Sequence, residues 1–156
     1  MALVLENANL TWQKVHKALA NASPAIRLAV RGLREYMANQ NGNQDLQLFN
    51  FTEAQADVSG GTVLLSGACR VYLAFVKKEN SATDNFTWIY DDATNDTTAA
   101  NARIEFPLLI ANDEQLYINA AGLTIATGLV VTQYTAPLGV TDGSNGGDGF
   151  ILVGRP

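Results

Sequence analysis

The chain has 156 residues, enough to bury a single core, and its net charge of −5 comes with only 16% charged residues, so its surface is only mildly polar. One cysteine excludes an internal disulfide, and no apolar run approaches the roughly 18 residues of a membrane span. The first residues also lack the basic and apolar segments of a signal peptide, so we expect a soluble protein that does not act at a membrane.

The charge is divided unevenly along the chain. Residues 1–40 carry five basic and two acidic residues, a net charge of +3, whereas residues 41–156 carry five basic and thirteen acidic residues, a net charge of −8. A basic leader on an acidic body indicates a segment that docks onto an acidic surface, and it argues against nucleic-acid binding by the body.

Two helices are expected in residues 1–40. Trp12, Val15 and Leu19 recur at helical spacing, and Ser23 followed by Pro24 is typical of the start of a second helix. The second helix has an apolar face formed by Ile26, Ala29, Val30, Leu33 and Met37. A second stripe, about a third of a turn away, consists of Arg27, Arg31 and Arg34.

Each helical feature has two interpretations. The apolar face either packs on the chain's own sheet or forms an interface between subunits through Ile26, Val30, Leu33 and Met37. The basic residues are either a solvated flank or a partner-binding set made of Trp12, Lys14, Lys17, Arg27, Arg31 and Arg34. His16, the only histidine, has no cysteine, histidine or carboxylate at ligand spacing, so no metal site is predicted.

Ala38–Asp45 (ANQNGNQD) is polar and lacks large apolar residues, which is typical of a hinge. We therefore predict two parts, a helical leader and anchor at residues 1–40 and a β-sandwich domain at residues 41–156.

The densest run of aliphatic and aromatic residues, Thr62–Asp92, is the expected centre of the sheet. Within it, Val71, Leu73 and Phe75 alternate with other residues, as in a strand with one buried face. Pro107 favours an edge or a bend. Further short strands are expected at Arg103–Phe106, Gln115–Asn119, Leu123–Ala126, Leu129–Thr135 and Phe150–Val153. About eight strands without intervening helices predict a mainly β fold, an antiparallel β-sandwich or jelly roll.

The loops contain no recognisable chemistry. Asp91–Ala100 lacks the ligand spacing of a calcium loop, and Gly139–Gly149 lacks the lysine and the following helix of a phosphate-binding loop. No nucleophile–base pattern is present either. The sequence therefore predicts no enzyme, no metal and no cofactor.

Several motifs resemble small β-sandwich virion proteins of tailed bacteriophages. They are Cys69–Tyr72, FTWIYDDATNDTT from Phe86, FPLLIANDEQLYI from Phe106, and the doubled Gly-Leu pattern of Ala121–Val131. This resemblance, over Ala68–Val153, implies a capsid decoration or auxiliary protein of the virion, assembled in the host cytoplasm. It implies attachment to the major capsid or another virion protein, and a homo-oligomer with a trimer as one option.

A second hypothesis belongs to another class. Trp88, Tyr90, Tyr117 and Tyr134 could stack on sugars in a carbohydrate- or receptor-binding module of a tail or fibre. The exposure of these aromatic rings distinguishes the two hypotheses.

Overall fold

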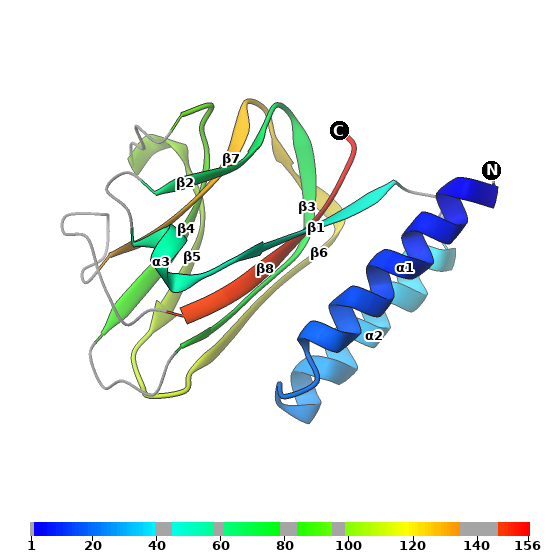
Figure 1. Ribbon diagram of the computed structural model, residues 1–156, viewed down its shortest axis with the longest axis horizontal. Coiled ribbons are helices and arrows are strands. Elements are labelled where there is room, and N and C mark those ends of the chain that lie inside the picture. Colours follow the sequence, from blue (N-terminus) through cyan, green and yellow to red (C-terminus); the bar gives the residue numbers. More distant parts are fainter. Residues whose placement is uncertain (1, 40–44, 58–60, 79–83, 95–98, 135–146) are drawn as a thin grey trace.

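The computed structural model describes residues 2–39, 45–57, 61–78, 84–94, 99–134 and 147–156, and over these residues the chain forms a jelly roll flanked by two long helices (Figure 1). Eight strands in the described residues make two antiparallel sheets of four. The helix-side sheet has the order β1 (Leu46–Phe51), β8 (Gly147–Gly154), β3 (Cys69–Lys78) and β6 (Glu114–Ile125). The distal sheet has the order β2 (Thr62–Ser66), β7 (Gly128–Tyr134), β4 (Asn85–Asp91) and β5 (Ala102–Leu108).

The strand pairing defines the topology. The pairs β1–β8, β2–β7, β3–β6 and β4–β5 join the first four strands to the last four in reverse order, which is the arrangement of a jelly roll. The predicted antiparallel sandwich or jelly roll of about eight strands is thus confirmed. Short helices at Glu53–Ala56 (α3) and Ala99–Asn101 (η1) complete the described elements.

Two helices form a third layer. Helices α1 (Ala2–Ala18) and α2 (Pro24–Asn39) lie side by side along the helix-side sheet (Figure 1). Their buried side chains join one core cluster with residues of that sheet, namely Leu46, Tyr72, Leu73, Phe75, Phe150 and Leu152. The helices therefore share a packed core with the helix-side sheet.

The turn between the helices is anchored to the sheet by polar contacts. The backbone N–H of Ser23 donates to Glu114 (3.0 Å), and Lys77 contacts both Glu114 (3.3 Å) and the carbonyl of Asn21 (3.4 Å). Helix α2 begins at Pro24 after Ser23, as predicted, and the Glu114 carboxylate lies at the positive end of its dipole.

Strand β3 is buried on both faces, which differs from the prediction of one. Val71 faces the sandwich core, whereas Leu73 and Phe75 face the helices. A register shift between Val71 and Leu73 reverses the alternation, so Ala74 and Val76 point into the sandwich. The prediction of a single buried face was wrong for two reasons. The bulge changes which residues of β3 point to each face of the sheet, and the helices cover the second face.

The edge strands and strand limits agree only in part with those predicted from the sequence. Pro107 lies in β5, an edge strand of the distal sheet, as its missing N–H predicts. The two strands expected at Gln115–Asn119 and Leu123–Ala126 are one continuous strand, β6. The predicted hinge, the polar loop at Asp91–Ala100 and the glycine-rich loop at Gly139–Gly149 lie partly or largely outside the described residues. The same is true of Asp57–Gly61 and Asn80–Asn85, whose residue types are typical of turns.

Candidate functional site

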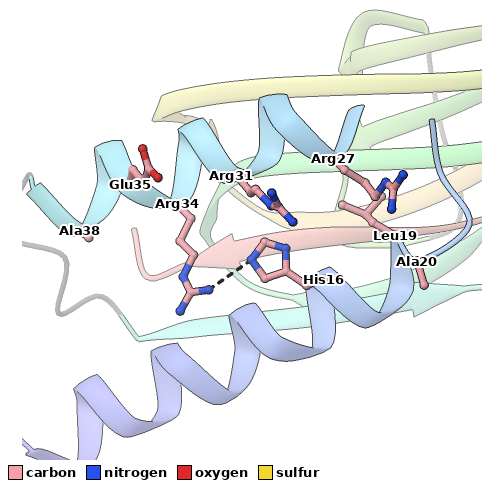
Figure 2. Close-up of a pocket in the computed structure, with 8 residues that line it drawn as sticks. All are labelled: His16, Leu19, Ala20, Arg27, Arg31, Arg34, Glu35 and Ala38. Atoms are coloured by element: carbon pink, nitrogen blue, oxygen red, sulfur yellow. Dashed lines mark hydrogen bonds between the residues drawn. The ribbon is translucent and has the colours of Figure 1, made fainter. Parts of the chain in front are cut away.

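A groove of about 560 Å³ lies between α1 and α2 (Figure 2). On each helix, the residues that line it are next to the face that packs on the sheet. Three arginines of α2 line it together with a histidine of α1, one carboxylate and three small or aliphatic residues. The lining residues are His16, Leu19, Ala20, Arg27, Arg31, Arg34, Glu35 and Ala38.

Helical geometry explains why the arginines gather there. Val30, Leu33 and Met37 form the stripe of α2 that packs on the sheet. Arg27, Arg31 and Arg34 follow the next stripe round the helix, and so they face the neighbouring helix. Figure 2 shows Arg31 and Arg34 reaching toward His16, while Arg27 lies near Leu19 at the end of the groove.

A hydrogen bond across the groove joins the two helices. Arg34 Nη1 lies 3.3 Å from His16 Nε2, and because a guanidinium can only donate, the imidazole accepts through Nε2 and is neutral in this arrangement. Burial lowers the pKa of His16, and the nearby positive charges of Arg34 and Arg31 lower it further. The histidine therefore holds one arginine in place without adding a positive charge near neutral pH.

The arginines lack acidic partners in the described part of the chain. Ion pairs there join Lys77 to Glu114, Arg103 to Asp91 and Arg155 to Asp45, and none involves a groove arginine. Glu35 lines the groove but forms no ion pair among these residues either. Guanidinium groups present several N–H donors in a planar fork that matches the oxygens of a carboxylate or phosphate. The arrangement is thus suited to binding an anionic group.

The structure divides the predicted partner-binding set. Arg27, Arg31 and Arg34 are brought together in the groove, as expected for one site. Trp12, however, is 5% exposed and packs in the core beneath His16, with ring centroids 6.3 Å apart, so its assignment to the partner-binding surface is wrong. Lys14 and Lys17 are exposed on α1 and do not line the groove.

The residues predicted for the subunit interface serve the chain's own core. Val30, Leu33 and Met37 are 0%, 4% and 6% exposed, and Ile26 packs against the same cluster. This stripe is buried against the helix-side sheet, which favours packing within the chain over an interface between subunits.

His16 was not predicted to belong to the site. Its position at the edge of the Trp12, Val15 and Leu19 stripe was the available signal, because a residue at such an edge lies beside the neighbouring element. Which element that is depends on the pairing of the helices, and a single sequence does not give it.

The aromatic residues considered for sugar binding are not exposed platforms. Trp88, Tyr90 and Tyr134 are 5%, 3% and 7% exposed and form one cluster with Phe86 and Val130 on the distal sheet. Burial raises the pKa of Tyr90 to about 12, with a further contribution from Tyr134. Tyr117 is half-buried and packs against the sandwich core. Trp88, Tyr90 and Tyr134 therefore offer no stacking surface for a sugar.

Comparisons with family models, curated proteins and solved structures gave no match. Among the described residues, no group of three or more histidine, cysteine or acidic side chains is placed to hold a metal ion. None of the described helices has the length and apolar character needed to cross a membrane.

Proposed function

We propose that this chain is a structural protein of a virus particle, a decoration or auxiliary protein that attaches to the major capsid or another virion protein. It attaches through the groove between α1 and α2, which meets an acidic surface of that partner, and copies of the chain self-associate on the particle. The observation that carries this proposal is the alignment of Arg27, Arg31 and Arg34 along one groove with no described carboxylate partner.

Other features support a role in contact. The jelly roll is a fold used by viral capsid and lectin domains, although fold alone does not assign function. Three of the four stacking residues of the lectin hypothesis, Trp88, Tyr90 and Tyr134, are buried. The thiol of Cys69 is 2% exposed, and burial, followed by the charge of Asp91, raises its pKa to about 11, so it is not a ready nucleophile.

The proposal is tested on virus particles. They are produced from the virus that carries the gene and purified by density-gradient centrifugation. Mass spectrometry should find the chain in the particle band, and added purified chain should sediment with particles that lack it. The double variant Arg27→Gln/Arg31→Gln should lose this co-sedimentation. The matched variant Lys14→Gln/Lys17→Gln, which removes the same charge outside the groove, should retain it.

Added salt should release the wild-type chain, because exposed ion pairs are screened at high ionic strength. Absence of the chain from the particle band, together with no co-sedimentation of the purified protein, would contradict a virion role. Equal loss of binding in both double variants would contradict the groove as the attachment site.

A further inference from the structure

We infer that the groove between α1 and α2 accepts an acidic α-helix of the partner protein, with carboxylates on one face spaced to meet Arg27, Arg31 and Arg34. This inference rests on the proposed function, because it names the structural element through which the particle is bound.

The spacing of the arginines favours a helical occupant. At 1.5 Å rise per residue, Arg31 lies about 6 Å and Arg34 about 10.5 Å along the helix axis from Arg27. Carboxylates at positions i, i+4 and i+7 of a second helix lying along α2 repeat these separations. An extended segment places side chains of one face about 6.7 and 13 Å from the first, which matches the second arginine but overshoots the third.

The shape and lining of the groove fit the same occupant. Two neighbouring helices leave a groove along their length, into which the side chains of a third helix can pack. Ala20 and Ala38 are exposed and give this groove a small apolar surface between the charged groups, whereas Leu19 is only 1% exposed. Leu28 of α2 is 70% exposed and lies one turn from Arg31, so an amphipathic helix could cover it while its carboxylates meet the arginines.

The charged groups that line the groove favour an anionic occupant. Arg27 and Arg31 are exposed, and half-buried Arg34 uses one N–H group on neutral His16, while its guanidinium carries further N–H donors. The one acidic lining residue, Glu35, leaves the groove with a net positive charge. Trp12, whose ring centroid lies 6.3 Å from that of His16, is buried, so it does not offer the exposed face for base stacking that single-stranded nucleic acids use.

The experiment uses the full-length protein and two synthetic peptides of identical composition. Each is an alanine-rich helix of about 20 residues, long enough to be helical in water. One carries three glutamates at i, i+4 and i+7, and the other carries the same three glutamates in consecutive positions. Binding is measured by fluorescence anisotropy at low ionic strength, with inorganic phosphate and a single-stranded oligonucleotide as competitors.

We expect the spaced peptide to bind more tightly than the consecutive one. Arg27→Gln/Arg31→Gln should weaken its binding by about tenfold, and Lys14→Gln/Lys17→Gln by less than about threefold, since exposed charge pairs contribute modestly. His16 is the only histidine, so its imidazole NMR signals can be followed without overlap. Its pKa should rise when the spaced peptide binds, because nearby carboxylates favour the imidazolium form.

Equal binding of the two peptides, or no change in the His16 pKa on binding, would overturn the acidic-helix inference. So would tighter binding of the oligonucleotide or of phosphate alone. The two proposals fail separately. A chain that sediments with particles but binds neither peptide leaves the virion role intact, and a chain that binds the spaced peptide but is absent from particles leaves only the helix-binding groove.

Discussion

Asp91 fastens the turn between β6 and β7 with both of its carboxylate oxygens. Its Oδ2 accepts the N–H of Ala126 (2.9 Å), and its Oδ1 accepts the N–H (2.8 Å) and the hydroxyl (2.9 Å) of Thr127. Burial alone would raise the pKa of Asp91, but the hydrogen bonds from Ala126, Thr127 and Gly128 outweigh it and hold the pKa below its ordinary value of 3.8. This residue is thus a structural clamp.

We predict that Asp91→Ala lowers the free energy of unfolding by about 2–3 kcal/mol at pH 7, because it leaves several donors without an acceptor. Urea unfolding measures the change. Since the pKa of Asp91 is depressed in the folded state, its contribution is complete above pH 3.8 and is lost as the pH falls through the folded-state pKa. The gap between wild type and variant should therefore narrow at acidic pH.

The control for Asp91 is Glu105→Gln, which alters an exposed carboxylate of the neighbouring strand β5. This change should stay within about 0.5 kcal/mol of wild type. If Asp91→Ala lowered the free energy of unfolding no more than the control does, Asp91 would not be a structural clamp.

Cys69 gives a second prediction at this scale. Its pKa of about 11 leaves about one thiol in a thousand ionised at pH 8, and its 2% exposure shields the sulfur. A thiol reagent should therefore label the native protein slowly, and added urea should accelerate labelling in step with unfolding. If the native protein were labelled as fast as the unfolded protein, Cys69 would not be a buried, unreactive thiol.

The sequence predicted the environments of these two residues unequally. The apolar run around Cys69 is typical of a buried cysteine, and its side chain is 2% exposed. Asp91 was placed in a solvated loop because it begins the polar stretch Asp91–Ala100, whereas it is the last residue of β4 and 8% exposed. Its partners follow 35 or more residues later in the chain, and a local pattern carries no sign of so distant a contact.

At the scale of single elements, Gly122 explains why β6 continues through an apparent break. One residue of β3, Tyr72, lies opposite the four residues Asn119–Gly122 of β6 between the register pairs on either side. The side chain of Asn119 accepts the N–H of Ala121 (3.1 Å), and Gly122 has φ 83°. Gly122, which lies between the two strands expected at Gln115–Asn119 and Leu123–Ala126, is therefore part of a bulge within one strand.

We predict that Gly122→Ala costs about 1–3 kcal/mol of stability. The left-handed φ disfavours a side chain, and an added Cβ would lie 2.9 Å from Cβ of Arg70. Gly32→Ala is the opposite case, because Gly32 lies in α2 and, apart from the adjacent backbone of its own helix, no heavy atom lies within 4 Å of the added Cβ. It should raise stability by about 0.5–1 kcal/mol, and thermal unfolding measures both changes.

Equal effects of the two glycine substitutions would contradict this account of the bulge. Helix α2 was predicted well, since Ser23 and Pro24 mark its start and the apolar stripe marks its buried face, whereas Asn9, a candidate start of the first helix, lies inside α1. Strand limits were predicted less well because bulges keep the chain extended where glycine alone suggests a turn.

At the scale of the whole molecule, the helices and the sheet depend on each other. An apolar stripe shows that one face of a helix is buried, but not which surface buries it. The sequence therefore could not predict that the helices and the helix-side sheet share one core, while the predicted hinge lies largely outside the described residues. The charge pattern was more informative, because the basic residues of α2 do form one surface on an otherwise acidic chain.

The shared core leads to a prediction about Leu33, which is 4% exposed against the helix-side sheet. Leu33→Ala should lower the free energy of unfolding by about 2–4 kcal/mol, because it leaves a cavity in the chain's own core. Light scattering should show the molar mass of wild type, and the unfolding midpoint should not depend on protein concentration. Leu28→Ala, on the same helix but 70% exposed, should change stability by less than about 0.5 kcal/mol.

A subunit interface at this stripe would give the opposite result. Leu33→Ala would then lower the molar mass, and the unfolding midpoint would rise with protein concentration by mass action. Retention of mass with loss of stability assigns Leu33 to the chain's own core and moves any contact between copies to another surface. The groove would then remain open to a partner in every copy, because the residues that form it and those that hold the helices on the sheet lie on different faces of α2.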